Sequence, residues 1–352
     1  MSTAPATPSE VPPYQTQSLI DHDAFGHSLL GAQVRCAQAL GSEIYVGCSN
    51  GELIRFALQA DDPNQLEAYR VLSQQSLPNG KPIDEIVLIP SISRALVLSD
   101  RQIHFYTLPS LDPVPHTLIK PIRNVVTFAV DEQHLNRPDP SLLNPGAPVE
   151  DVEFCVIKRN NVALFRLREK LFYQKEIPFQ QGAVVARRFG HTLCLADHEF
   201  YSIVDLERTS LFQLLPVSQA PEPPLTPLQP SITVVTDNEF LILSWDGSGT
   251  MGVFITGDGE PVRGTLQWPG YPQSICLDYP YVAALLPNGT IEIHSVETQT
   301  IAQVIPLPPS PSSDHTPPSH WLQLASCLKG YLVPSTQRSE KMKPTSVRLL
   351  RE

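Results

Sequence analysis

Residues 44–58, IYVGCSNGELIRFAL, decide the fold class. An apolar run ends in the turn Asn50-Gly51, and in the run that follows apolar residues alternate with polar ones. Asn and Gly tolerate the positive φ angles that a tight turn requires, and a period of two is typical of a half-buried strand. The segment therefore predicts a β-hairpin.

The same pattern returns five times along the chain. Its other turns are Asp100-Arg101, Asn160-Asn161, Asp197-His198, Gly247–Gly249 and Asn288-Gly289. Their spacing averages just under 50 residues, and most intervals also contain a leading apolar run, at 84–89, 125–130, 183–187, 232–235 and 274–277. Each unit therefore has room for about four strands, which is the content of a propeller blade.

A lone four-stranded sheet cannot bury both of its faces, whereas sheets packed around a ring can. We therefore predict an all-β fold, a seven-bladed β-propeller. A weaker seventh unit would cover 320–350, and a strand near 14–20 would help to close the ring. A β-sandwich is the alternative, but it predicts no period longer than a hairpin.

Proline makes up 36 of the 352 residues, about twice its usual share. Because proline costs about 3 kcal/mol inside a helix, a long-helix bundle is disfavoured. One candidate helix, Asn64–Leu77, contains several good helix formers. We predict a flexible tail at 1–18 and a single domain at 19–352, with Pro-rich insertions near 131–150, 215–231 and 306–320.

The net charge of −11 disfavours a general nucleic-acid binder, which needs a basic surface to neutralise phosphates. The N-terminal stretch lacks the features of a secretion signal, and no apolar run approaches the ~18 residues of a membrane span. Six scattered cysteines without a C-x-x-C pair indicate reduced packing residues. These features predict a cytoplasmic protein.

Two motifs resemble enzyme signatures. Residues 247–252 match G-x-G-x-x-G and residues 47–51 match G-x-S-x-G. Both signatures require a helix next, but here a strand pattern follows, so a hairpin explains the glycines. The ten histidines form no cluster with zinc spacing. We predict no catalytic, cofactor or metal site; a hydrolase with its site in the central channel is the alternative.

Charge placement gives one hypothesis about a binding surface. In a propeller the hairpin turns within the blades share one face, which would bring Arg101 near Lys158 and Arg159. Cations grouped on an acidic protein can dock an acidic partner; ordinary solvated turns are the alternative. Arg187-Arg188 would lie at the opposite end of the strand that contains them, and there too a docking patch and ordinary solvated residues are the two interpretations.

Four segments resemble a known family. They are LGSEIYVGCSNGELIRF (40–56), KPIDEIVLIPSISRALVLSDRQIHFY (81–106), IKPIRNVVTFAV (119–130) and YVAALLPNGTIEIHS (281–295). They are similar to the citron-homology domain, and more closely to the N-terminal domains of the family of vacuolar sorting protein three and the TGF-beta-receptor-associated protein. The resemblance spans roughly 34–337, and its most specific part is 81–106.

In that family a β-propeller precedes a long α-solenoid in a subunit of CORVET, the early-endosomal tethering complex. The resemblance implies a non-catalytic domain without a cofactor that docks on an endosomal Rab GTPase and on other tethering subunits. It also implies a cytoplasmic location, peripheral on endosome and vacuole membranes through these partners. A lipid-binding propeller remains an alternative, which the net charge of −11 disfavours.

Overall fold

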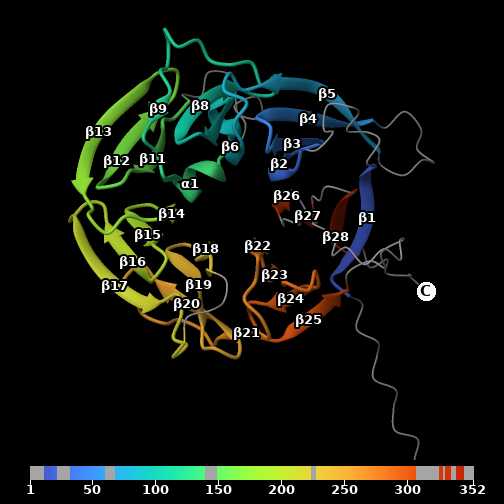
Figure 1. The fold of residues 1–352 in the computed structure, drawn as a ribbon, viewed down its shortest axis with the longest axis vertical. Helices are drawn as coiled ribbons and strands as arrows, with labels where there is room; N and C mark the ends of the chain where they lie inside the picture. Colours follow the sequence, from blue (N-terminus) through green and yellow to red (C-terminus); the bar gives the residue numbers. More distant parts are fainter. Residues whose placement is uncertain are drawn as a thin grey trace, which may run out of the picture.

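The computed structural model describes residues 12–21, 32–59, 68–138, 149–222, 227–306, 325–327, 330–333 and 338–344. Four-stranded antiparallel sheets surround a central axis, and the first strand of each blade lies nearest to that axis (Figure 1). The chain is therefore an all-β propeller, and the β-sandwich alternative was wrong.

Six blades are built from consecutive strands. Blade I contains β2 (Val34–Leu40), β3 (Glu43–Cys48), β4 (Glu52–Gln59) and β5 (Ala68–Ser76). Blade II contains β6 (Ile83–Ile89), β7 (Arg94–Ser99), β8 (Gln102–Thr107) and β9 (Ile122–Arg123). Blade III contains β10 (Thr127–Val130), β11 (Val152–Ile157), β12 (Asn161–Leu167) and β13 (Leu171–Pro178).

The other three blades continue around the ring. Blade IV contains β14 (Val185–Phe189), β15 (Thr192–Ala196), β16 (Phe200–Asp205) and β17 (Ser210–Pro216). Blade V contains β18 (Ile232–Thr236), β19 (Glu239–Trp245), β20 (Thr250–Thr256) and β21 (Leu266–Trp268). Blade VI contains β22 (Ser274–Asp278), β23 (Tyr281–Leu285), β24 (Ile291–Ser295) and β25 (Ile301–Ile305).

The predicted count of seven blades needs correction, because six blades, not seven, are built from consecutive strands. After blade VI the described chain supplies three strands, β26 (Ala325–Cys327), β27 (Gly330–Val333) and β28 (Arg338–Pro344). These pair with the N-terminal strand β1 (Tyr14–Asp21) in a separate sheet of order β1-β28-β27-β26. This sheet joins the two ends of the chain, so it is no repeat of the predicted unit.

The N-terminal strand is anchored on blade VI by Tyr14. The backbone of Tyr14 exchanges two hydrogen bonds with the Gln303 amide, at 2.9 and 2.8 Å, and its hydroxyl donates to Asp278 at 2.7 Å. β1 thus confirms the strand expected near 14–20, and it begins within the range 1–18 that was predicted as a tail. The segments 139–148, 223–226 and 307–324, in the Pro-rich stretches, lie outside the described residues.

All six predicted turns are confirmed as connections between the second and third strands of a blade. Asp100 and Arg101 both have positive φ, as the tight β7–β8 turn requires. The matches to G-x-S-x-G and G-x-G-x-x-G fall at the β3–β4 and β19–β20 hairpins, with strands after them. Neither glycine motif therefore has the helix that its enzymatic signature needs.

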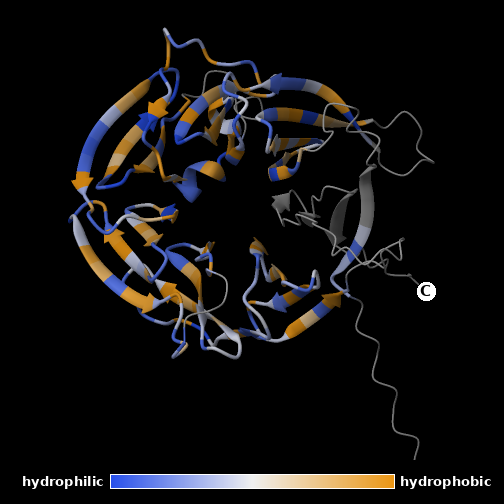
Figure 2. Cartoon of the chain, in the orientation of Figure 1, coloured by the Kyte–Doolittle hydropathy of each residue, from blue (hydrophilic) through white to orange (hydrophobic). Residues whose placement is uncertain are grey.

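The core lies between neighbouring blades. Six of the seven residues of β19 are buried, and Figure 2 shows hydrophobic and hydrophilic stretches mixed along outer strands such as β13 and β17. Five described cysteines are free, and four of them are buried. The continuous apolar runs in the sequence are thus strands covered on both faces.

The expected helix at Asn64–Leu77 was wrong. Residues 68–76 form β5, which pairs with β4 along its whole length, because the edge of β4 needs a partner and tertiary pairing outweighs weak helix propensity. Described helices are limited to the 3-10 turn η3 (Pro90–Ile92) and the four-residue α1 (Glu132–Leu135). Neither helix could reach across a bilayer.

Candidate functional site

The structure brings together the three cations proposed for partner binding. Arg101 lies in the β7–β8 turn of blade II, whereas Lys158 and Arg159 lie in the β11–β12 turn of blade III. Val125 donates its backbone N–H to the Arg101 carbonyl at 2.9 Å, and the next residue donates to the Ile157 carbonyl at 2.8 Å. The two turns are therefore neighbours on one face, although their role in binding stays a prediction.

Two further cations extend this group. Arg123 in β9 lies opposite Gln102, and the Lys81 carbonyl accepts a hydrogen bond from Ser99 Oγ at 3.2 Å, beside the β7–β8 turn. We call the five residues Lys81, Arg101, Arg123, Lys158 and Arg159 the basic arc. Four of them are exposed and Lys158 is half-buried.

No side chain of the basic arc forms an ion pair with another described residue. Sequence reasoning missed Lys81 and Arg123 because it considered only the hairpin turns. Both lie beside connections that run from the outer strand of one blade to the inner strand of the next. Such connections share the face of the hairpin turns, so position within the repeat could have identified these two residues.

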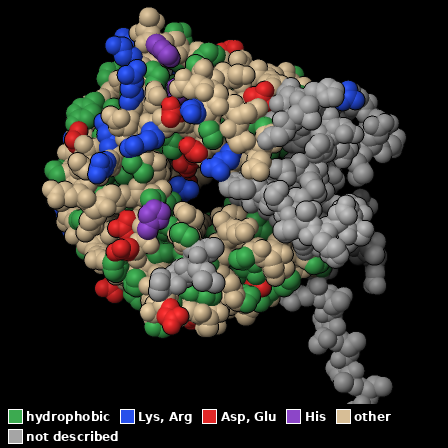
Figure 3. Space-filling model, viewed as in Figure 1, with side chains coloured by type: hydrophobic (Ala, Val, Ile, Leu, Met, Phe, Trp, Pro, Cys, Tyr) green, Lys and Arg blue, Asp and Glu red, His purple; other side chains and the backbone are tan. Residues whose placement is uncertain are grey.

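Charge is distributed unevenly around the ring. Residues 81–178, which cover blades II and III, contain 12 Lys and Arg against 12 Asp and Glu, so the net charge of −11 arises elsewhere in the chain. On the face drawn in Figure 3, Lys and Arg side chains gather over the sector of β6–β13. Among blades I–VI, blades II and III therefore repel an acidic partner least.

Arg188 has a different role from either one that the sequence suggested. Its side chain on β14 is 5% exposed and lies between blades III and IV. Its Nη2 pairs with Glu153 Oε2 at 2.6 Å, its Nε lies 3.6 Å from Asp131 Oδ2, and the same Nε donates to the Gly190 carbonyl at 2.8 Å. Solvation and docking are both excluded for this residue, because it joins two blades as a buried cation.

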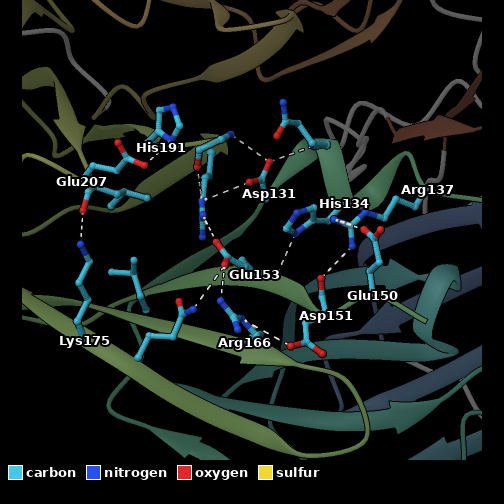
Figure 4. A pocket seen from close by; sticks show the side chains of 16 residues that line it. Asp131, His134, Arg137, Glu150, Asp151, Glu153, Arg166, Lys175, His191 and Glu207 are labelled. Carbon is cyan, nitrogen blue, oxygen red and sulfur yellow. Dashed lines mark hydrogen bonds and ion pairs between the residues drawn. The ribbon is translucent and has the colours of Figure 1, made fainter. Parts of the chain in front are cut away.

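The carboxylates around Arg188 are held by further contacts (Figure 4). Asp131 accepts from the backbone N–H groups of Gln133 and Gly190, both at 3.1 Å, and so caps α1. Burial alone would raise the pKa of Glu153, but the hydrogen bond and charge of Arg188 hold it below its usual value. Glu153 is therefore ionised at neutral pH.

His134 on α1 completes this network. Its Nδ1 accepts the backbone N–H of Glu153 at 2.9 Å, so the neutral ring carries its proton on Nε2. Burial lowers the pKa of His134, which keeps the ring neutral at physiological pH. The histidine thus fixes α1 against the start of β11.

A cleft of about 630 Å³ opens over this network, between blades III and IV. Arg166 lines it, 3.3 Å from Glu153, as does Lys175, whose Nζ donates to the Leu206 carbonyl at 2.5 Å. Every buried polar side-chain atom that lines the cleft has a partner within the described chain. The charges of the cleft therefore satisfy one another, and their arrangement requires no ligand.

The central channel contains carboxylates that sequence reasoning missed. A cavity of about 800 Å³ is lined by the inner strands and includes Glu85, Glu132 and Arg187. Burial raises the pKa of both glutamates, and the charge of Arg187, which is 3.6 Å from Glu85, opposes the shift. Glu85 follows Asp84 in an otherwise apolar strand, and this interruption was the available signal.

Two curated relatives match more than three quarters of this chain. The chain is 28% identical over 279 residues to transforming growth factor-beta receptor-associated protein 1 of Mus musculus, covering 78% of this chain and 30% of that protein. It is 24% identical over 282 residues to vacuolar protein sorting-associated protein 3 of Saccharomyces cerevisiae, covering 77% and 25%. The chain thus spans about a quarter to a third of the curated relatives that it matches.

Two solved structures show a similar fold. The AfRom2 CNH domain has a TM-score of 0.57 at 17% identity, with 95% of this chain and 100% of that chain covered. The Neurospora crassa Pan2 WD40 domain has a TM-score of 0.62 at 9% identity, with 96% and 98% covered.

The family model described as the VPS3 N-terminal domain matches residues 32–307. The chain therefore belongs to the family of VPS3 N-terminal domains.

Proposed function

We propose that this propeller is a non-catalytic interaction domain of a CORVET-like endosomal tethering subunit. It docks on an endosomal Rab GTPase and on other tethering subunits during transport between endosome and vacuole. One observation carries the proposal: the family match covers residues 32–307, and blades I–VI extend from Val34 to Ile305. The whole propeller body is therefore the unit that this chain shares with vacuolar sorting proteins.

The physical features support a recognition role. A ring of sheets stabilised by buried contacts between blades presents connecting loops on two faces, and these loops can vary without disturbing the core. Among the described residues, no group of three or more His, Cys, Asp or Glu side chains is arranged to hold a metal ion. The domain thus offers surfaces for partners and would reach membranes through them.

A pull-down against a panel of purified Rab GTPases, each loaded with GDP or with a GTP analogue, tests this function. We expect capture of at least one endosomal Rab in its GTP form. If a folded domain captures neither a Rab nor a purified tethering subunit, the proposed function is wrong. Circular dichroism on the same sample confirms that the domain is folded.

We assign partner binding to Arg101, Lys158 and Arg159. Reversal of all three charges with glutamate should lower affinity for the captured partner at least tenfold, since rim charges control association and specificity. Unchanged affinity would remove this assignment and leave the docking function intact. The variant removes exposed or half-buried cations that form no ion pair with another described residue, so its stability should match that of the wild type.

A propeller hydrolase is the second candidate, favoured by Glu85 and Glu132 in the central channel. A carboxyl group with a raised pKa can act as a general acid near neutral pH. A screen with generic ester, glycoside and peptide substrates tests this candidate. Turnover that disappears in the Glu132→Gln variant would favour it over the interaction role.

A further inference from the structure

The face that carries the basic arc is divided into a cationic and an anionic part. Its hairpin turns in blades II and III contribute Arg101, Lys158 and Arg159, together with one anion, Asp100, next to Arg101. The turn of blade IV contains Asp197 and Glu199, and that of blade V contains Asp246, whereas the turns of blades I and VI, residues 49–51 and 286–290, are uncharged. Among these six turns, Lys and Arg therefore occur only in the neighbouring blades II and III.

The two parts also differ in what their side chains already bind. Asp197 Oδ1 accepts from the backbone N–H groups of Glu199 and Phe200, both at 2.7 Å. Asp246 Oδ1 accepts from Ser248 and Gly249, at 2.7 and 2.8 Å. No side chain of the basic arc has a hydrogen bond or ion pair with another described residue. Asp197 and Asp246 hold their own turns together, whereas the cations of the basic arc are available to a partner.

The arc is short enough for one narrow ligand. The Arg101 carbonyl accepts a hydrogen bond from the backbone N–H of Val125. Val126 donates its backbone N–H to the carbonyl of Ile157, the residue before Lys158. Two cross-strand steps of ~5 Å and two chain steps of ~3.8 Å place the Cα atoms of Arg101 and Lys158 within about 18 Å of each other. An extended segment of about five or six residues spans that distance.

We infer that the basic arc binds an extended acidic polypeptide segment of the partner. A planar anionic bilayer would meet the whole face, including the anionic turns of blades IV and V, and would be repelled by them. A narrow acidic segment can follow the cationic sector and avoid these turns. The inference rests on the proposed interaction role, and it specifies the chemistry of the partner.

Titration of a fluorescein-labelled deca-glutamate peptide, followed by fluorescence anisotropy in 50 and 150 mM NaCl, tests the inference. We expect saturable binding that weakens with salt, because exposed charges are screened. The Arg101→Glu/Arg159→Glu variant should lower affinity at least tenfold. The matched control is Arg168→Glu/Lys170→Glu, which alters two exposed cations in the β12–β13 connection and gives the same net charge.

The control separates location from overall charge. Affinity within twofold of wild type in the control, together with the loss in the arc variant, supports the inference. Equal losses in both variants would overturn it, because attraction would then depend on net charge alone. A second experiment measures flotation of the domain with vesicles of 70% phosphatidylcholine and 30% phosphatidylserine. The inference would also be overturned if the wild type binds these vesicles but not the peptide, and if only the arc variant loses vesicle binding.

The outcomes distinguish this inference from the proposed function. A domain that captures a GTP-loaded Rab but does not bind deca-glutamate keeps its proposed function and refutes the inference. A domain that binds the peptide at the arc but captures neither a Rab nor a tethering subunit supports the inference and refutes the proposed function. Cross-linking of the bound peptide followed by mass spectrometry checks that it lies at the basic arc.

Discussion

Replacement of Arg188 by methionine is the sharpest test of how the blades are held together. The substitution keeps an apolar stem and removes the guanidinium, which leaves Glu153 and Asp131 without their buried cation. Breaking a buried ion pair from one side typically costs about 3–5 kcal/mol. Glu153 is 27% exposed and Asp131 keeps two backbone donors, so we expect the lower end, about 3 kcal/mol.

In a domain of this size each kcal/mol lowers the melting temperature by about 2 °C, so Tm should fall by about 6 °C at pH 7.5. Differential scanning calorimetry measures the change. A matched control is Arg208→Met, which removes an arginine that is 84% exposed and lies 3.7 Å from Asp205. Because exposed ion pairs contribute little, the control should shift Tm by no more than about 2 °C.

The loss in Arg188→Met should also depend on pH. In the wild type the pKa of Glu153 is lower in the folded state than in the unfolded state, where it is about 4.3. This difference stabilises the fold at pH values above the unfolded pKa, and the stabilisation is lost as the pH falls through the folded pKa. Without Arg188, only Gln174 and Arg166 oppose the effect of burial, so the pKa of Glu153 should be higher in the variant than in the wild type, and protonation relieves the variant. The difference in unfolding free energy between wild type and variant should therefore shrink from pH 7.5 to pH 5.

Two results would refute this reasoning. A loss below about 1 kcal/mol would show that Arg188 is not a buried clamp. A double variant, Glu153→Gln/Arg188→Met, should be less destabilised than the sum of the two single variants, since it leaves one fewer unpaired charge. Strict additivity would mean that the two side chains act independently.

Three further predictions concern the ring and its channel. Tyr14→Phe removes the hydrogen bond to Asp278 and should cost about 1–2 kcal/mol in urea unfolding; no loss would show that Tyr14 does not anchor β1. Gly51 has φ +83°, and an added Cβ would lie 2.9 Å from backbone atoms in the connection between β5 and β6. Gly51→Ala should therefore lower the free energy of unfolding by about 2 kcal/mol or more, and an unchanged Tm would contradict this prediction. Glu85→Gln removes a carboxylate whose burial is unfavourable but whose ion pair with Arg187 is favourable, and the two effects offset each other. The free energy of unfolding, measured by thermal unfolding at pH 7.5, should therefore change by less than about 1 kcal/mol. A loss above about 3 kcal/mol would contradict this balance.

Local patterns in the sequence predict the blades because each hairpin is a local structure. Turns such as Asn50-Gly51 and Asn288-Gly289 combine residues that tolerate positive φ with apolar runs on both sides, and the structure places strands there. Segment 68–76 has no such turn, so its helix formers suggested a helix. Only its pairing with β4 makes it a strand, and that pairing depends on the rest of the sheet.

The Arg188 cluster could not be predicted in the same way. Its partners Asp131 and Glu153 lie 57 and 35 residues away along the chain, and one of them is in the insertion between β10 and β11. A pair of arginines at the end of a strand gives no sign that one will be buried by a neighbouring blade. The basic arc was partly predictable, because three of its five residues lie in hairpin turns that the repeat places on one face.

We propose that this chain is a rigid propeller that docks on its partners through its loops. Hydrogen–deuterium exchange of the domain, alone and with a GTP-loaded Rab, measures both parts at once. We predict slow exchange in the second strands of the blades in both states, with binding-induced protection at residues 99–102 and 157–161. Fast exchange in those strands would show that the propeller is not rigid, and no protection with any Rab or tethering subunit would show that it does not dock through these loops.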